Sequence, residues 1–146
     1  MRLCVNAVKP NAIIHLGDHY DDGKILAEEN PQLPVYLVPG NCDAYRGFIR
    51  DPEVQVEKVC GVRLFFTHGH RHHVKTGLYS LLQNARAANV QAVLYGHTHS
   101  ADCHQEEDGL WVLNPGSCGY YGGSAGLMEV DQGKILSCRI LRSEDL

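Results

Sequence analysis

Four short, mainly apolar segments of the chain each lead into a glycine beside an aspartate, asparagine or histidine. Runs of four or five apolar residues bounded in this way are typical of buried strands. The segments and their endings are Ala12–Leu16 with Gly17-Asp18, Val35–Val38 with Gly40-Asn41, Val62–Phe66 with His68-Gly69, and Ala92–Tyr95 with Gly96-His97. The carboxyl ends of parallel strands meet at one edge of an open α/β sheet. The pattern therefore predicts an α/β fold with its chemistry gathered at that edge.

Helical and hairpin patterns connect these strands. Residues 21–30 can form a helix that stops before Pro31, which makes the first two strands part of a β-α-β unit. Val54–Val59 alternates as a strand does and joins the third segment through a tight turn, which predicts a hairpin. Thr76–Asn89 carries leucine and alanine at helical spacing and precedes the fourth strand.

The last third of the chain changes character and predicts antiparallel strands. These are Leu110–Leu113, Gly126–Val130 and Ile135–Leu141, with Asp131–Lys134 as the turn between the last two. A parallel α/β half followed by a β-rich half favours two sheets packed face to face with helices outside. We therefore predict an α/β fold of four layers, an αββα sandwich of two mixed sheets.

Composition limits the class of protein further. The chain has 146 residues, of which 44% are hydrophobic and 21% charged, and its formal net charge is −4. This suits a single domain over residues 1–146 and argues against an extended nucleic-acid surface. No apolar stretch approaches the roughly 20 residues that cross a membrane, and no signal-peptide core follows the first residues. We expect a cytoplasmic protein with no membrane partner.

Histidine is the residue type that points to a metal. Six of the nine histidines lie in two clusters, at residues 68–73 and 97–99, whereas the six cysteines are scattered without a C-x-x-C pair. A carboxylate can bridge two divalent ions, and amide oxygens and neutral imidazoles complete shells that suit Mn, Fe, Co, Ni or Zn. The candidate metal ligands are Asp18, Asn41, His68, His97 and His99.

Each candidate also has a purely structural interpretation. Asp18 could cap a helix, Asn41 could belong to a turn, and the histidines could be buried side chains with ordinary hydrogen-bond partners. Their joint occurrence at strand ends favours the metal interpretation. For the segments around them, residues 71–73 are expected in a solvated loop, and Asn114–Ser117 either turns the chain or lines the site.

The order of these motifs resembles a known family. Gly-Asp, Gly-Asn-x-Asp, Gly-His and Gly-His-Thr-His, over residues 11–141, are similar to the calcineurin-like metallophosphoesterases, and most of all to their small bacterial and archaeal phosphodiesterase branch. The resemblance implies that Asp18 bridges two divalent ions, with manganese favoured. It implies that Asn41, His68 and His97 complete the shell of one ion, and that His99 serves the other.

The same resemblance implies an activity. A member of this family would hydrolyse a small phosphodiester or phosphoester with a metal-activated hydroxide. Cys42 stands where larger members have a histidine that protonates the leaving group, so His70 becomes the candidate for that role. Asp43 would orient a ligand or a water. The predicted catalytic residues are therefore Asn41, His70 and Asp43, with Cys42 as a small neighbour rather than a nucleophile.

One departure from the family pattern supports a second interpretation. The family has an Asp-x-His after its opening strand, and this chain lacks one. Met1–Val5 resembles that strand and residues 6–10 resemble the end of the following helix, yet a parallel crossover needs a dozen residues or more. Either a block of sequence is absent, or the deletion is genuine. A genuine deletion favours a non-catalytic protein-binding scaffold, as in the retromer subunit that resembles this branch. An exposed edge strand could also pair two copies into a homo-oligomer.

Overall fold

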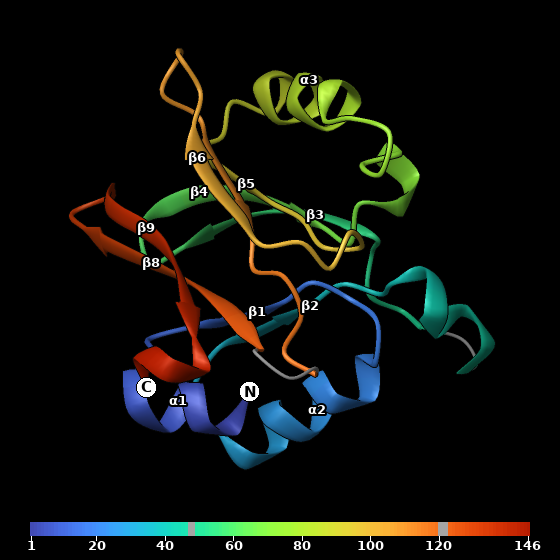
Figure 1. Ribbon diagram of the computed structural model, residues 1–146, viewed down its shortest axis with the longest axis vertical. Coiled ribbons are helices and arrows are strands. Elements are labelled where there is room, and N and C mark those ends of the chain that lie inside the picture. The colour runs from blue at the N-terminus through green and yellow to red at the C-terminus, as the bar shows by residue number, and fades with distance from the viewer. Residues whose placement is uncertain (47–48, 120–122) are drawn as a thin grey trace.

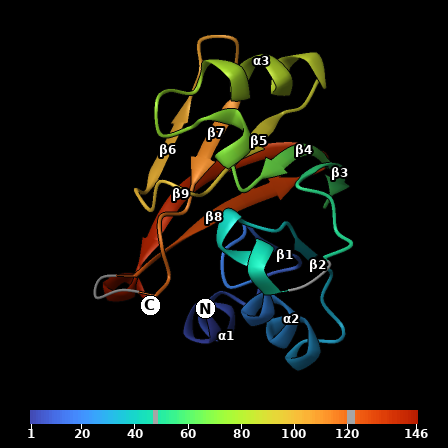
Figure 2. The same cartoon turned by 90° about the vertical axis from the view of Figure 1, so that its right-hand side faces the viewer.

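The computed structural model describes residues 1–46, 49–119 and 123–146. Its elements lie in four layers (Figures 1 and 2). Helix α3 (Tyr79–Ala87) covers the outer face of a five-stranded sheet, and a second layer of strands separates that sheet from α1 (Arg2–Val8) and α2 (Tyr20–Glu29). The predicted α/β architecture, with two layers of strands between helices, is confirmed.

The five-stranded sheet is mixed. Its order is β3 (Val54–Val59), β4 (Val62–Thr67), β5 (Ala92–Leu94), β7 (Trp111–Asn114) and β6 (Asp102–Gln105). The three central strands run parallel, and the two edge strands are antiparallel to their neighbours. The predicted hairpin of β3 and β4 is confirmed. Strand β7, predicted as one of the antiparallel strands, runs parallel to β5 and is antiparallel to β6, a strand that was not predicted from the sequence.

The facing layer consists of two separate pairs in the described part of the chain. Strand β1 (Ile13–His15) runs parallel to β2 (Val35–Leu37), and β8 (Ser124–Asp131) forms an antiparallel hairpin with β9 (Lys134–Arg142). Figure 1 shows β8 on the side of this hairpin that is nearer β1. The second layer is thus a parallel pair beside a hairpin, where we predicted one mixed sheet.

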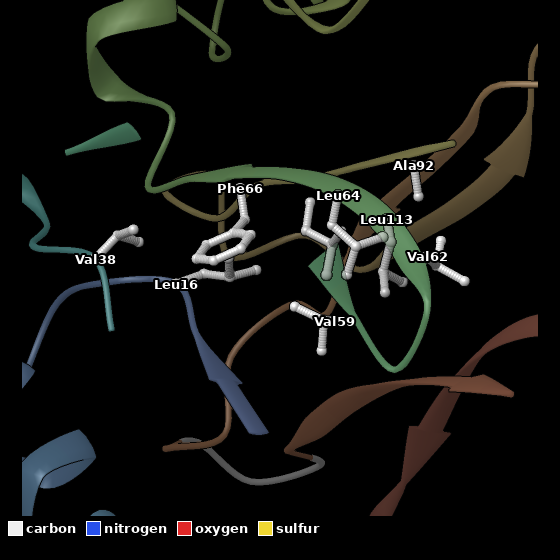
Figure 3. Packing of buried hydrophobic residues seen from close by; sticks show 9 residues of the cluster. Leu16, Val38, Val59, Val62, Leu64, Phe66, Ala92 and Leu113 are labelled. Atoms are coloured by element: carbon white, nitrogen blue, oxygen red, sulfur yellow. The ribbon is translucent and has the colours of Figure 1, made fainter. Parts of the chain in front are cut away.

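Two apolar cores hold the layers together, and β4 contributes to both through the alternation of its side chains. Leu64 and Phe66 face the second layer, where they pack with Leu16 and Val38 (Figure 3). Phe65 faces the opposite way, into the cluster beneath α3. Phe66 has no exposed area, so its replacement by alanine would cost about 3–5 kcal/mol. This packing fixes the ends of the strands that carry the candidate ligands.

The first residues differ from the prediction. The segment Met1–Val5, predicted as a strand, lies in helix α1, which ends at Val8 with Lys9 in a left-handed conformation (φ 50°). Val5 and Asn6 are consecutive residues of this helix. Arginine, leucine and alanine favour a helix, and the few residues before β1 are too short for a crossover between parallel strands. Local propensity and chain length therefore explain the change.

None of the helices in the described ranges is both long enough and apolar enough to cross a membrane.

Candidate metal centre

The candidate ligands lie at the carboxyl ends of strands in both layers. Asp18 follows β1, Asn41 follows β2 and begins the 3-10 helix η1 (Asn41–Arg46), and His68 follows β4. His97 and His99 follow β5. The structure brings side chains from all four strand ends together, as predicted. They come from strands in two separate layers, however, rather than from one edge of a single sheet.

His68 is the centre of this arrangement. Its side chain is only 2% exposed, and its Nδ1 donates a hydrogen bond to the carbonyl oxygen of Leu16 at 2.7 Å. A carbonyl oxygen can only accept, so Nδ1 carries the proton and Nε2 presents a lone pair. Burial also lowers the pKa of His68. The ring is therefore neutral near pH 7 and oriented as a metal ligand needs to be.

Three further ligand atoms converge on His68 Nε2. Asn41 Oδ1 lies 3.0 Å away, His97 Nδ1 lies 3.1 Å away, and Asp18 Oδ2 lies 3.5 Å away. Two ligand atoms that each lie about 2.1 Å from a shared ion are about 3.0–3.4 Å apart. The separations from His68 are close to that range, and the mixture of imidazole, amide and carboxylate suits a divalent transition ion.

The histidine and carboxylate side chains of the site do not by themselves form a compact cluster in the described residues. Within the described ranges, no three or more histidine, cysteine, aspartate and glutamate side chains are grouped closely enough to count as a metal site. The convergence at His68 depends on the amide of Asn41, which is not one of those four residue types, and on the longer approach of Asp18. Asn41 Oδ1 and the unprotonated Nε2 of His68 present lone pairs to each other at 3.0 Å, as two ligands of one ion would.

His99 lies in a looser part of the site. Its Nε2 is 3.8 Å from Asp18 Oδ2, and its side chain is 55% exposed. Asp18 is therefore the residue that faces both His68 and His99. Burial alone would raise the pKa of the Asp18 carboxyl. The backbone N–H of Cys42 and the nearby His68 lower this pKa by more than burial raises it, so the net shift is downward. Asp18 is ionised at neutral pH, as a bridging ligand would be.

Glycines let the strand ends approach one another. A Cβ at Gly40 would overlap the Asp18 carboxylate, and a Cβ at Gly17 would lie 2.7 Å from His68 Nδ1. Three candidate ligands, Asp18, His97 and His99, also have positive φ angles of 55°, 69° and 57°. Such conformations are unfavourable outside glycine and cluster at functional sites.

Asp43 is buried and takes part in the framework of the site. One carboxylate oxygen accepts from the Tyr20 N–H at 2.9 Å, and the other accepts from the Gly40 N–H at 2.7 Å. These bonds join the loop after β1 to the loop after β2. Asp43 therefore holds the backbone of the two loops, one of which carries Asp18. Its predicted role of orienting a ligand stays a prediction.

His70 lies beside the convergence. Its ring centroid is 5.4 Å from that of His68 and 6.2 Å from that of His97. Its Nε2 is 3.7 Å from Glu53 Oε1, and its Nδ1 is buried without a hydrogen-bond partner. The ring is close enough to the site for the predicted acid role, which remains a prediction.

The neighbouring histidines differ from expectation in one respect. Arg71 and His73 are exposed, as predicted for a solvated loop, but His72 is buried and packs edge-on against Phe65 at 5.8 Å. Burial lowers the pKa of His72. The expectation of a solvated His72 is wrong because the short 3-10 helix η2 (His70–His72) turns this side chain onto the sheet.

Cys42 has an exposed side chain next to Asp18. The negative charge of Asp18, followed by desolvation, raises the pKa of the thiol. A raised pKa disfavours the thiolate, so Cys42 is a poor nucleophile.

Asn114 is the residue of the site whose importance sequence reasoning underestimated. It is fully buried and donates hydrogen bonds into the loop that carries His97 and His99. Its place at the end of an apolar strand, followed by Pro115-Gly116, is the same signal that identified the other strand ends.

A hollow of about 470 Å³ lies elsewhere, at the amino ends of β5 and β7. Gln91 and Trp111 are among the residues that line it, whereas the candidate ligands follow the opposite ends of these strands. The hollow is therefore separate from the candidate metal centre.

Known proteins share both sequence and fold with the chain. The family model described as the calcineurin-like phosphoesterase superfamily domain matches residues 2–133. Phosphodiesterase MJ0936 of Methanocaldococcus jannaschii is 29% identical over 140 residues, which cover 82% of this chain and 76% of that protein. A Streptococcus pneumoniae protein described as a predicted phosphoesterase is 25% identical, with a TM-score of 0.76 over 98% of this chain and 80% of its own.

The fold is also similar to that of Vps29 from Entamoeba histolytica, in a structure of the wild-type protein complexed with zinc. That likeness has a TM-score of 0.71 at 22% identity and covers 95% of this chain and 87% of the other. The family match extends over most of the chain and includes every candidate ligand. The chain belongs to the calcineurin-like phosphoesterase superfamily, whose members generally use divalent metal ions.

Proposed function

We propose that the chain is a divalent-metal-dependent phosphodiesterase that hydrolyses a small phosphodiester or phosphoester. The observation that carries the proposal is the convergence of Asn41 Oδ1 and His97 Nδ1 within 3.1 Å of the unprotonated Nε2 of His68. Membership of a phosphoesterase superfamily and similarity to a phosphodiesterase support the choice of reaction.

The residues present fit a divalent ion, and manganese is the ion we propose. Asp18, Asn41, His68 and His97 would hold it, and His99 would reach a second ion across Asp18. A divalent ion bound there would polarise a phosphoryl oxygen and lower the pKa of a coordinated water. Mixed oxygen and nitrogen donors are compatible with manganese, although such sites generally bind later first-row ions more tightly.

The chain's own residues prepare the site for this chemistry. Leu16 orients His68 by accepting its Nδ1 proton, and the Cys42 N–H holds Asp18 Oδ1 at 3.1 Å. Asp43 accepts hydrogen bonds from the N–H groups of Gly40 and Tyr20 and so holds the backbone of the loops that follow β1 and β2. His68 and Asp18 are thus held by backbone contacts, which is the kind of preorganisation that catalysis requires.

His70 is the residue we propose to protonate the leaving group. Its imidazole lies beside His68 and His97, and Glu53 is near its Nε2. Imidazole is the side chain that most often acts as a general acid or base in enzymes. The raised pKa of the Cys42 thiol supports direct attack on phosphorus by water rather than by the protein.

The proposal is tested by hydrolysis of bis(p-nitrophenyl) phosphate and p-nitrophenyl phosphate with added Mn²⁺, Ni²⁺, Zn²⁺ or Mg²⁺ and after chelation. We expect hydrolysis that depends on the metal and favours the diester. His97→Ala should abolish it, and His104→Ala, at a histidine paired with Asp102 and Glu106, should not. Hydrolysis that is absent with every metal would overturn the proposal.

One observation favours a second candidate, a protein-binding scaffold on the same fold. In the described part of the chain, Asp18 and His99 are the only candidate ligands that face the second ion, and His99 is more than half exposed. A scaffold would show neither metal-dependent hydrolysis nor loss of partner binding in His97→Ala. The same set of variants therefore distinguishes the two functions.

A further inference from the structure

We propose that Asn114 is a positioning residue that holds the loop bearing His97 and His99 in the conformation required for metal binding. The proposal rests on the proposed function, since it concerns the same metal site. Asn114 is the last residue of β7 and has no exposed area. It acts through the loop and is not itself a candidate ligand.

The amide of Asn114 uses all its main hydrogen-bonding groups. Its Nδ2 donates to the Gly96 carbonyl at 3.3 Å and to Thr98 Oγ1 at 2.9 Å, and its Oδ1 accepts from the Gly116 N–H at 2.9 Å. The Gly96 carbonyl can only accept and the Gly116 N–H can only donate, so the amide has a single consistent orientation. A buried amide satisfied in this way is rigid.

These bonds continue the sheet where its backbone ladder stops. The last backbone bond between β5 and β7 beyond their paired residues runs from the Tyr95 N–H to the Leu113 carbonyl at 3.0 Å. On the other side, the Gly96 N–H donates to the His68 carbonyl at 3.0 Å. The Asn114 side chain therefore replaces the missing strand partner of Gly96, immediately before the chain turns into the ligand loop.

The loop itself needs such support. His97 and His99 both have positive φ angles, and Thr98 between them donates its N–H to the Gly96 carbonyl at 2.8 Å. Left-handed conformations at non-glycine residues persist only where surrounding contacts impose them. Asn114 supplies such a contact by donating to the Thr98 hydroxyl. With the loop held in this way, the His97 ring lies against His68 and the His99 ring faces Asp18.

Asn114 is in turn anchored to the second layer. Ser124, the first residue of β8, donates its hydroxyl to the Pro115 carbonyl at 2.6 Å and its N–H to the Ser117 carbonyl at 3.0 Å. A Cβ at Gly116 would overlap the Ser124 hydroxyl, so this contact also requires glycine there. The ligand loop is thereby connected through Asn114 to both layers of strands.

The test measures Mn²⁺ binding by isothermal titration calorimetry together with thermal unfolding of the metal-free protein. Thr98→Val removes the hydroxyl that Asn114 holds, together with its longer contacts to the Ser100 N–H at 3.3 Å and carbonyl at 3.5 Å, while preserving side-chain shape. Thr98→Ser is the matched control that keeps the hydroxyl. Asn114→Asp removes the donors themselves. Loss of partners that orient metal ligands typically weakens metal binding about 10- to 100-fold.

We expect Mn²⁺ affinity to fall about 10-fold or more in Thr98→Val and to stay within about 3-fold of wild type in Thr98→Ser. Higher Mn²⁺ concentrations should restore the hydrolysis rate of Thr98→Val. If wild type binds Mn²⁺ and folded Thr98→Val binds it equally well, the role of Asn114 is overturned and the proposed function stands. If wild type binds none of Mn²⁺, Ni²⁺, Zn²⁺ and Mg²⁺, both are overturned. Asn114→Asp adds a buried carboxyl and can lose stability for that reason, so the threonine pair decides the result.

Discussion

The two halves of the candidate metal centre differ in the separation of their ligand atoms and in the exposure of their histidines. In the half formed by Asn41, His68 and His97, the ligand atoms of Asn41 and His97 lie within 3.1 Å of His68 Nε2, and His68 is 2% exposed. In the other half, Asp18 and His99 are 3.8 Å apart and the His99 side chain is 55% exposed. We refer to them as the His68 half and the His99 half.

The difference follows from what supports each ligand. The His68 ring is fixed by the Leu16 carbonyl and enclosed by glycines from two neighbouring loops. His99 lies two residues beyond His97, past the reach of the sheet's backbone ladder, and its loop is held by side-chain contacts. His68 is therefore held by the backbone and buried, whereas His99 is exposed at the end of a loop that side-chain contacts hold. An ion in the His68 half should bind more tightly than one in the His99 half.

The largest effect is expected for Asp18→Ala, because Asp18 faces both halves. Its Oδ2 lies 3.5 Å from His68 Nε2 and 3.8 Å from His99 Nε2. Even partners that only orient a metal ligand cost about 10- to 100-fold in affinity, so loss of a shared ligand should cost at least 100-fold. Equilibrium dialysis with Mn²⁺ measures the change. The control is Asp131→Ala at the β8–β9 turn, and retention of wild-type affinity by Asp18→Ala would contradict the shared role.

The difference in metal affinity between the His68 half and the His99 half is tested by His68→Gln and His99→Gln. We expect His68→Gln to weaken the tighter Mn²⁺ site about 100-fold, and His99→Gln to change that site less than about 10-fold while removing the weaker one. Metal stoichiometry and affinity from the same titration measure both results. Equal losses in the two variants would show that the halves depend on each other as one unit.

Sequence reasoning predicted most of the fold, and the reasons for its failures are physical. The strand endings at Asp18, Asn41, His68 and His97 could be placed together because parallel strands bring their carboxyl ends to one edge. The helix at Arg2–Val8 could not be recognised, since the segment also fits a strand, and only local helix propensity and the short distance to β1 favour the helix.

The finer features of the site depend on tertiary contacts that carry no periodic signal. Both oxygens of Asp43 are occupied by the backbone of Gly40 and Tyr20, which are 3 and 23 residues away. His72 is buried through the path of a single 3-10 turn. Residue types indicate what such side chains can bond, whereas the bonds they form are decided by how the loops of two layers meet.

A smaller effect concerns the dependence of stability on pH in the metal-free protein. Burial lowers the pKa of His68 below its usual value of about 6.5, so the unfolded chain binds a proton there before the folded protein does. The contribution of His68 to the free energy of unfolding is therefore fully present above about pH 6.5. It is lost as the pH falls from there through the pKa of His68 in the folded state.

Urea unfolding in the presence of a chelator, from pH 7.5 to 5, measures this dependence. His68→Gln should remove about 1.4 kcal/mol of the stability lost on acidification for each unit by which the pKa of His68 is depressed. Some dependence on pH should remain, because burial also lowers the pKa values of His15 and His72. His99→Gln is the comparison variant from the exposed half. A slope that His68→Gln leaves unchanged would show that desolvation of this ring does not control acid sensitivity.

The smallest effect is expected for Cys42→Ala, next to the residue that both halves share. Cys42 holds Asp18 Oδ1 mainly through its backbone N–H at 3.1 Å, and alanine keeps that donor while it loses the smaller contact of the thiol with Asp18. The thiol is exposed and its pKa is raised by Asp18, so it supplies neither a thiolate nor burial. Mn²⁺ affinity and diester hydrolysis should stay within about 3-fold of wild type, as is usual for exposed substitutions worth less than about 0.5 kcal/mol. A loss of 10-fold or more would assign the sulfur a chemical role and would mean that Asp18 is held by more than the backbone.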